Sequence, residues 1–428
     1  MLLHLLLSLL ATSSPALGHY CLEGVAGDNC DDLDAIIKRL FTNYSRYERP
    51  KPRRFGADNS TTDTVFVEIN MYINTISAVN IVDMDFRLDT LLRQRWYDPR
   101  LDVGDRYNFS EVPIHLHMRD IWLPDLFFRN SKSSTLHAIT TPNTLAWITS
   151  NGMITYSQKL TIGLFCHMQL WDFPMDTQYC SANIGSYGYS MRDLEFRWWN
   201  EGEYDKSGQK RSGAALNAAV QLEDGHINEF AVVKHTCTYC DRTYKTTGNF
   251  TCLNVEFQLS RKFGFYLIYA YLPSLLVVLI AWMSFLIDCE ATAARTSLGL
   301  LTVLSLITQS AAVLSQLPRV SYIKAIDIWF FTCFSFVVGA LLEFAFVNTA
   351  ARKEAKRRQK QRTPSFNLSV VHQATDESVN RQREARIYCL TARCLDRVSA
   401  IVYPLCFLLF NIIYWSVYLH HCHLDHRK

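Results

Sequence analysis

Four stretches in the second half of the chain are each apolar over a length that can cross a lipid bilayer. A membrane-spanning helix needs about 20 mostly apolar residues. Stretches of this kind lie at residues 265–287, 297–314, 328–347 and 398–419. The sequence therefore predicts a protein that crosses a membrane four times.

The first 18 residues resemble a secretory signal peptide, since an apolar run is followed by small residues, although a basic start is missing. Cleavage there and four crossings would leave both mature ends outside the cell. The segment between the third and fourth spans would then be cytoplasmic, and its basic residues agree with that side of the membrane. They are Arg352, Lys353, Lys356, Arg357, Arg358, Lys360 and Arg362, with Arg393 and Arg397 before the fourth span.

This topology divides the chain into segments. We expect a signal peptide at 1–18, an extracellular domain at 19–262, three helices at 263–348, a cytoplasmic loop at 349–397, a fourth helix at 398–420 and an extracellular tail at 421–428. Four N-glycosylation sequons precede the first span, which supports the same orientation. Their asparagines are Asn43, Asn59, Asn108 and Asn249.

The extracellular segment carries short runs with alternating or β-branched character, at residues 64–73, 80–88, 144–148, 153–164 and 253–259. Turn residues separate such runs, for example Asp98-Pro99 and Asn151-Gly152. Helical spacing and an acidic first turn at 31–42 predict a short helix before the strands. The pattern favours an antiparallel β-sandwich.

Seven cysteines lie in this segment, and an extracellular compartment favours disulfides. Spacing alone does not fix the pairs. Cys237 and Cys240 form a CxxC pair, but no second CxxC or HxxxH lies nearby, so a zinc site is not expected. Cys166 and Cys180 enclose a strong turn candidate, the sequence FPMD at 173–176, whose proline could be cis.

The loop from Cys166 to Cys180 resembles the signature loop of Cys-loop pentameric ligand-gated ion channels. Further motifs of that family follow in its order along the chain. They are WYDPRL at 96–101, IWLPDLFF at 121–128, SYGY at 186–189, a proline at 273 and ARTSLGLLTVL at 294–304. Within that family the chain resembles the glutamate- and glycine-gated chloride channels.

This resemblance implies an α+β membrane protein, in which an extracellular antiparallel β-sandwich precedes a four-helix transmembrane bundle. Five subunits would surround a central pore, as homo- or hetero-pentamer, with agonists bound between neighbours. It also implies disulfides joining Cys166 to Cys180 and, in the loop that caps the agonist, Cys240 to Cys252. Cys237 is then unpaired, and Cys21 with Cys30 is a candidate third bridge. No cofactor is implied.

One face of the second span combines small, hydroxyl and leucine side chains at helical spacing, as the wall of a water-filled pore would. From the residues alone, a polar seam against another helix fits equally well, and the resemblance favours the pore. The residues are Ala293, Ser297, Leu301, Leu304, Thr308, Ala312 and Ser315. Leu304 resembles the family's gate leucine, whose ring would exclude water when the helices stand close.

Ion selectivity is expected to depend on Ala293, Ala294 and Arg295 at the cytoplasmic mouth. Cation-passing relatives usually have glutamate immediately before the basic residue, whereas chloride-passing relatives usually have proline and alanine there. Ala294 therefore favours chloride, with positive potential from Arg295, although the usual proline is missing. A cation-selective member of the same superfamily is the alternative.

The family's agonist-binding residues carry over one by one. On the principal face, Phe127, Tyr187 and Tyr244 would form an aromatic box that attracts an ammonium group. Ser186 would offer a hydroxyl or a carbonyl beside it. The capping loop adds Thr247 and Phe250.

On the complementary face, Arg93 matches the arginine that holds the agonist carboxylate, and Ser157 matches its hydroxyl partner. Without the resemblance both would be ordinary strand side chains. Glycine- and GABA-gated relatives often have a glutamate where this chain has Gly185. Glutamate-gated relatives use a second arginine where it has Asn74, for which Lys159 is a candidate substitute. An amino-acid agonist is predicted, glutamate or glycine first, with an amine or protons as alternatives.

A further expectation concerns macrocyclic lactones, which open many such channels from within the membrane. Sensitive relatives have a very small residue where the third span has Phe331. The bulk of this side chain predicts weak sensitivity.

Other classes of protein fit the sequence less well. A net charge of +3 suggests no nucleic-acid partner. The sequence has no phosphate loop, metal cluster or nucleophile arrangement that would indicate an enzyme. A cell-surface adhesion glycoprotein would have one or two spans with purely apolar faces. We therefore expect a neurotransmitter-gated chloride channel subunit in the plasma membrane, at a postsynaptic site.

Overall fold

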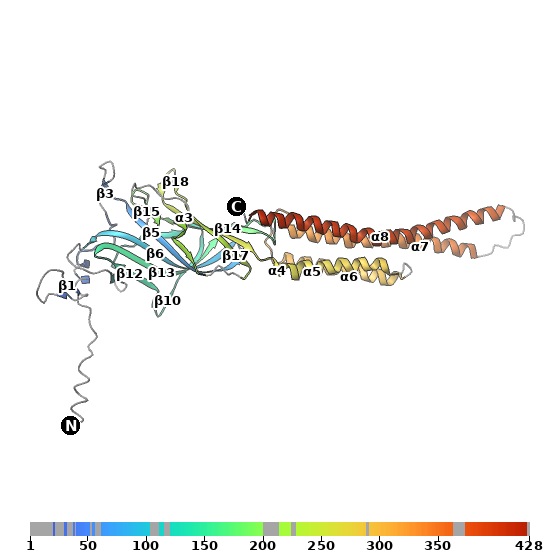
Figure 1. Cartoon of the computed structure of the whole chain (residues 1–428), viewed down its shortest axis with the longest axis horizontal. Helices are drawn as coiled ribbons and strands as arrows, with labels where there is room; N and C mark the ends of the chain where they lie inside the picture. Colours follow the sequence, from blue (N-terminus) through green and yellow to red (C-terminus); the bar gives the residue numbers. More distant parts are fainter. Residues whose placement is uncertain are drawn as a thin grey trace, which may run out of the picture.

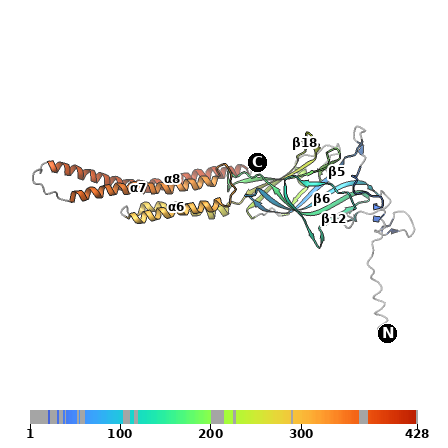
Figure 2. The ribbon, with the colours of Figure 1, turned by 180° about the vertical axis from the view of Figure 1, so that it is seen from behind.

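The computed structural model describes residues 20–21, 30–31, 37–38, 40–51, 54–55, 61–102, 111–114, 120–199, 214–223, 228–287, 291–362 and 373–425. The molecule is elongated, with strands gathered at one end and long helices at the other (Figure 1). The view from behind shows the same division (Figure 2). The expected signal peptide and the sequons at Asn59 and Asn108 lie outside the described residues.

The larger sheet of the strand domain has eight strands in the order β15-β5-β6-β13-β12-β7, with β16 beside β5 and β9 beside β13. In β5, every second residue from Val65 to Ile73 is fully buried, as a strand with one core face requires. The strands are β5 (Val65–Asn80), β6 (Asp85–Asp102), β7 (Val112–Pro113), β9 (Ser131–Leu136), β12 (Thr144–Ile148), β13 (Asn151–Phe165), β15 (Leu194–Trp198) and β16 (Val220–Leu222).

The smaller sheet packs against the larger one and has the order β17-β20-β14-β8. The rings of Phe86 and Phe257 meet between the sheets at 6.2 Å, and both are fully buried. Its strands are β8 (Leu126–Phe128), β14 (Thr177–Ser186), β17 (Phe230–Tyr239) and β20 (Cys252–Arg261). The remaining short elements are β1 (Tyr20–Cys21), β2 (Cys30–Asp31), β3 (Arg54–Phe55), β4 (Thr61–Thr62), β10 (Ala138–Ile139), β11 (Thr141–Pro142), α3 (Ala214–Asn217), β18 (Arg242–Tyr244) and β19 (Gly248–Phe250).

The predicted β-sandwich is confirmed, with corrections. The larger sheet is mixed, since β15 and β16 both run parallel to β5. The predicted strand at 80–88 is confirmed only for residues 85–88, which begin β6. Residues 81–84 form a turn in which the Asn80 side chain accepts hydrogen bonds from Val82 and Asp83. The predicted turn at Asp98-Pro99 is wrong. These residues lie within β6, where the pairing with β13 shifts register and absorbs the extra length.

The predicted helix at 31–42 starts later than expected. Asp31 lies in β2, opposite Tyr20, and the described helical residues are 37–38 and 40–41. Cys21 and Cys30 face each other across β1 and β2, so the register is compatible with the candidate bridge between them.

Four helical stretches are long and apolar enough to cross a membrane, at Gly264–Leu286, Thr292–Leu314, Ala325–Ala350 and Cys394–His420. The first contains a π-helical turn directly before Pro273, whose ring would clash with the carbonyl four residues earlier in a regular helix. It consists of α4 (Gly264–Tyr266), η3 (Leu267–Tyr271), α5 (Leu272–Met283) and η4 (Ser284–Leu286). The others belong to α6 (Thr292–Leu314), α7 (Ala325–Arg362) and α8 (Gln373–Asp425).

Much of the expected cytoplasmic loop at 349–397 is helical. The third span continues in α7 to Arg362, and the fourth is preceded by the first part of α8 from Gln373. Residues 350–362 are mostly alanine, lysine, arginine, glutamine and glutamate, which are strong helix formers. The two helices run side by side in both views (Figures 1 and 2).

The helices of the bundle are joined by buried polar contacts among aromatic residues. The hydroxyls of Tyr271 and Tyr414 lie 2.8 Å apart and link the first span to α8. The Trp329 indole N–H donates to the Ser274 hydroxyl at 2.8 Å and links α7 to the first span. Both ends of these bonds are buried, so they pair groups that would otherwise be unsatisfied in an apolar layer.

The loop between β13 and β14 contacts the helices directly. The Trp171 carbonyl accepts a hydrogen bond from the Ala325 N–H at 2.9 Å, at the start of α7. The Trp171 ring stacks on Tyr322, between α6 and α7, with 4.1 Å between ring centroids. A displacement of this loop would therefore be transmitted to the link between the second and third spans.

Candidate functional site

The loop that resembles the family signature is closed by a disulfide between Cys166 and Cys180, at an S–S distance of 2.02 Å. Its Phe173–Pro174 peptide is cis. Asp176, at the end of this loop, forms a two-point ion pair with Arg261, with distances of 2.7 Å from Nε and 3.0 Å from Nη2. Both side chains are buried. The pair ties the loop to the last residue of β20, immediately before the first span.

A second disulfide, between Cys240 and Cys252, closes the base of the hairpin formed by β18 and β19. Cys252 lies opposite Gly185 of β14, which in turn lies opposite Phe127 of β8. This register brings the segments expected on the principal face to one end of the smaller sheet.

Four aromatic residues of the expected principal face form two ring pairs. Phe127 and Tyr187 meet edge to face at 5.4 Å, and Tyr244 and Phe250 at 5.8 Å. Tyr187 is 80% exposed and Tyr244 is 50% exposed in the single subunit. Thr247 is exposed in the turn of the hairpin. These rings are free to contact a ligand or a neighbouring subunit.

The structure changes the interpretation of Ser186. Its hydroxyl donates to the Asp125 carboxylate at 2.7 Å, and the side chain is buried. The other carboxylate oxygen of Asp125 accepts the backbone N–H groups of Tyr187 and Gly188. The hydroxyl of Ser186 is therefore already used inside the subunit, and a contact of its carbonyl with the agonist stays a prediction. Its hydroxyl holds the loop that carries Tyr187 in place.

The expected complementary residues lie side by side on the exposed face of the larger sheet. Arg93 of β6 is opposite Ser157 of β13 on one side and Asn70 of β5 on the other. Its Nη1 donates to the Asn70 side-chain oxygen at 3.2 Å, and the guanidinium lies 5.9 Å from the Tyr72 ring centroid. Sequence analysis missed Asn70 and Tyr72, because their place beside Arg93 depends on strand register.

Two other complementary candidates are less directly placed. Asn74 lies at an irregularity in the pairing of β5 with β6, two positions beyond Tyr72. Lys159 lies opposite Leu91 and shares a strand face with Ser157. Both therefore flank the cluster around Arg93.

The candidate pore helix α6 has two distinct faces in the single subunit. Its buried residues are Arg295, Gly299, Thr302 and Leu306, which pack toward the other helices. The opposite face is exposed and includes every residue of the expected pore stripe. These are Ala293, Ser297, Leu301, Leu304, Thr308, Ala312 and Ser315, with Leu301 at 61% and Leu304 at 58% exposure. Ala294 is exposed as well.

Comparison with protein families agrees with this arrangement of domains. A model described as the neurotransmitter-gated ion-channel ligand binding domain matches residues 33–263. A model described as the neurotransmitter-gated ion-channel transmembrane region matches residues 270–386. The chain belongs to the neurotransmitter-gated ion-channel family. It is a subunit of a Cys-loop pentameric ligand-gated channel, and the expected fold class is confirmed.

In this channel subunit, Arg295 does not lie on the face of α6 that carries the expected pore stripe. Its guanidinium is buried and makes a two-point ion pair with Asp396 of α8, at 3.1 Å from Nη1 and 2.8 Å from Nη2. Its Nε also donates to the Ile287 carbonyl at 3.0 Å. The expectation that Arg295 adds free positive charge at the pore mouth is therefore wrong. A carboxylate from α8 neutralises it inside the subunit.

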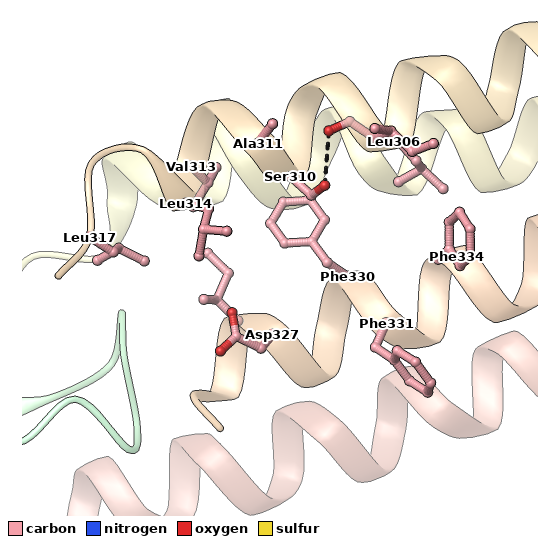
Figure 3. A pocket seen from close by; sticks show the side chains of 12 residues that line it. Leu306, Ser310, Ala311, Val313, Leu314, Leu317, Asp327, Phe330, Phe331 and Phe334 are labelled. Atoms are coloured by element: carbon pink, nitrogen blue, oxygen red, sulfur yellow. Dashed lines mark hydrogen bonds between the residues drawn. The ribbon is translucent and has the colours of Figure 1, made fainter. Parts of the chain in front are cut away.

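A groove of about 400 Å³ lies between α6 and α7 of the channel subunit, lined on one side by residues 306–317 and on the other by residues 326–334. Figure 3 shows Phe330 pointing toward α6, whereas Phe331 points away from it. Phe331 is 74% exposed in the single subunit. Its ring is therefore available to a neighbouring subunit or to lipid.

Two of the predicted glycosylation sites fall within the described residues. Asn43 and Asn249 are both exposed, and Asn249 lies in β19 of the capping hairpin. Exposure is compatible with a glycan at either position, and their use stays a prediction.

Cys237 is a free, buried cysteine beside the capping hairpin. Burial raises the pKa of its thiol to about 12, and only the thiolate reacts rapidly with thiol reagents. At pH 8 about one thiol in 10,000 would be ionised. Methanethiosulfonate applied to the folded channel should leave Cys237 unlabelled at pH 7 and at pH 9, and label it after denaturation. Mass spectrometry of tryptic peptides measures this, and rapid labelling of the folded protein would contradict it.

Proposed function

We propose that this subunit forms a chloride channel opened by an amino acid, glutamate or glycine first, that binds between neighbouring subunits. The observation that carries the proposal is Arg93. It is a half-buried guanidinium between Asn70 and Ser157, and no described carboxylate pairs with it. A guanidinium fork with neutral neighbours suits a planar carboxylate from outside the chain.

The rings on the other face complement this cation. Tyr187 and Tyr244 are exposed, and each has a second ring beside it. The negative faces of such rings attract an ammonium group. When the principal face of one subunit meets the complementary face of the next, these groups would hold the two ends of an amino acid.

The gate of the proposed channel is the ring of five Leu304 side chains. Leu304 is exposed on α6, with the hydroxyl of Thr308 one turn further along the same face. A narrow apolar ring excludes water and ions, and a wider ring admits them. The channel would therefore open when the five α6 helices tilt or rotate apart.

The motion caused by agonist binding would be transmitted to the gate through contacts that join the two domains. Closure of the capping hairpin would move β20, which leads directly into the first span. The Asp176–Arg261 ion pair couples β20 to the signature loop. That loop contacts Tyr322 and the first residue of α7, next to the end of α6. The motion would thus reach the pore helix from both neighbouring spans.

Chloride selectivity is proposed from Ala294 and from the absence of acidic residues. No aspartate or glutamate lies between Thr292 and Leu314. The first residues of α6 present the positive end of the helix dipole to the cytoplasmic mouth. With Arg295 neutralised by Asp396, these backbone dipoles would contribute positive potential at the mouth.

Replacing Ala294 by glutamate should convert the channel to a cation-preferring one. Five carboxylates would then ring the narrow mouth, and a ring of acidic side chains favours cations. The reversal potential in oocytes should lose most of its dependence on external chloride and follow sodium instead. Ala294→Gln is the control, because glutamine is nearly the same size as glutamate but carries no charge. This variant should remain chloride-selective. If Ala294→Glu remained chloride-selective, the selectivity filter would lie elsewhere.

Weak sensitivity to macrocyclic lactones is also proposed, because Phe331 is 74% exposed on α7 and its bulk would fill space between this helix and a neighbouring subunit. Phe331→Gly should increase the current evoked by ivermectin by about tenfold or more, because loss of the ring would leave room for the lactone beside α7, and about 1.4 kcal/mol of added binding free energy corresponds to a tenfold change in affinity. Phe334→Gly is a control on the same helix. Strong activation of the unmodified channel would contradict the proposal.

The orientation in the membrane is proposed from the same features. α8 ends at the side of the bundle where the strands lie (Figure 1). Both mature ends would therefore be extracellular in a plasma-membrane subunit, and a postsynaptic location would follow from gating by a transmitter.

A further inference from the structure

The partly or fully buried arginines of the strand domain fall into two groups. Seven arginines before residue 262 are described as intermediate or buried. Five of them have a carboxylate partner within 3.0 Å, namely Arg49, Arg95, Arg100, Arg197 and Arg261. Only Arg93 and Arg129 lack an ion pair among the described residues. Removing a guanidinium from water without a partner is costly, so both positions call for an explanation.

Arg129 lies over Gly185, at the place where a side chain from β14 would otherwise stand. A Cβ added to Gly185 would lie 2.5 Å from Arg129 Nε and 3.0 Å from its Nη2. The absence of a side chain at 185 is therefore what makes room for the guanidinium. Phe127, two residues before Arg129, pairs in register with Gly185.

The contacts of the Arg129 side chain leave most of its hydrogen-bonding capacity unused. Its Nη2 donates to the Thr251 carbonyl at 3.1 Å, directly before Cys252 at the base of the capping hairpin. Its Nε is buried and has no hydrogen-bond partner among the residues that the structure describes. Since a guanidinium has five N–H donors and a full charge, one neutral carbonyl leaves it poised for an anion.

We propose that Arg129 is a second anion-binding residue of the agonist site, so that the agonist carries an anionic group at each end, as an aminodicarboxylate does. The inference rests on the proposed function, since it takes Arg93 as the partner for the first carboxylate. Arg129 supplies the second cation from the principal face, where Gly185 brings no carboxylate. On the complementary face, Asn74 supplies no arginine.

This assignment accounts for the pairing of Gly185 with Arg129. A glutamate at 185 would place a carboxylate against the guanidinium and neutralise it, and it would attract the ammonium of a monocarboxylate amino acid. With glycine there, the charge of Arg129 stays available and the ammonium is left to the rings of Tyr187 and Tyr244. The principal face thus selects for an additional negative charge on the ligand.

The test compares agonists with one and two carboxylates on the full chain expressed in oocytes. Glutamate and aspartate carry two, and glycine and β-alanine carry one. Arg129→Gln removes the charge but keeps an amide that can donate to the Thr251 carbonyl, so the hairpin stays anchored. It should raise the half-maximal concentration of glutamate by about 30-fold or more, because a charged contact is lost, and change that of glycine by less than about threefold.

Two further variants sharpen the comparison. Arg95→Gln is the matched control, because Arg95 already pairs with Glu68 and should leave the ratio between the agonists unchanged. The double variant that combines Arg129→Ala with Gly185→Glu should reverse the agonist preference, so that glycine and β-alanine act at lower concentrations than glutamate and aspartate.

The outcomes separate the inference from the proposed function. The inference is overturned if Arg129→Gln shifts both agonist classes equally or shifts neither, while Arg93→Ala still weakens both. It is also overturned if only monocarboxylates open the channel. If Arg93→Ala changes no agonist response, or if none of the four compounds opens a channel shown by biotinylation to reach the surface, the proposed agonist site itself is wrong.

Discussion

Replacing Arg93 by alanine should raise the half-maximal agonist concentration by about 100-fold or more. The guanidinium lies between Asn70 and Ser157, and no carboxylate in the described part of the chain pairs with it. Removing one partner of a hydrogen-bonded charge pair costs about 2–5 kcal/mol, and each 1.4 kcal/mol corresponds to about a tenfold change in affinity. Concentration–response curves in oocytes measure the shift, and surface biotinylation shows that the variant still assembles.

Arg95→Ala is the matched control for this result. It removes the same side chain from the same face of β6, two residues further along. Arg95 is already paired with Glu68 and lies 4.2 Å from the Trp199 ring, so an agonist gains little from it. A shift below about threefold is expected. Equal shifts for both variants would mean that Arg93 acts only through the general potential of this face, and would contradict its role as the carboxylate-binding residue.

Replacing Asp176 by asparagine should destabilise the extracellular domain and reduce surface expression severely. The Asp176–Arg261 pair is buried, and Arg261 lies between the rings of Phe173 and Phe230. Breaking a buried pair leaves an uncompensated charge and typically costs about 3–5 kcal/mol. That is a large part of the stability of a typical domain, about 5–15 kcal/mol. Surface biotinylation and the thermal unfolding of detergent-solubilised channel measure the effect.

The control for this second prediction is Asp85→Asn, which breaks the exposed pair with Lys132. Exposed pairs contribute about 0–1 kcal/mol, so expression and unfolding temperature should stay close to those of the unmodified channel. Combining Asp176→Asn with Arg261→Gln should recover part of the loss, because no charge is then left buried alone. An Asp176→Asn channel that reached the surface normally would contradict this account of the pair.

Sequence patterns predicted the architecture because they report local properties. Length and apolar composition are sufficient to find four spans, and alternation is sufficient to find strands such as β12. The ends of elements were predicted less well, since they depend on neighbours. Asp98-Pro99 has the chemistry of a turn, yet the register shift between β6 and β13 keeps it inside a strand.

In the candidate site, too, motifs identified single residues but not their partners from distant parts of the chain. Motifs led to Arg93 and Ser157, and the register places them opposite each other. They did not reveal that Ser186 is bonded to Asp125 or that Arg295 is neutralised by Asp396, because these partners lie 61 and 101 residues away in the chain. Arg129 was missed for a related reason. Its position above Gly185 results from the pairing of β8 with β14, which no local pattern contains.

The central claim is that this subunit forms an agonist-gated channel for chloride. The most direct test is the reversal potential of the agonist-evoked current in oocytes at two external chloride concentrations. For a chloride channel, a tenfold reduction in external chloride should move the reversal potential by about 59 mV toward positive voltages. Replacing external sodium by a large impermeant cation should leave it unchanged. A reversal potential that ignored chloride and followed sodium would contradict the account.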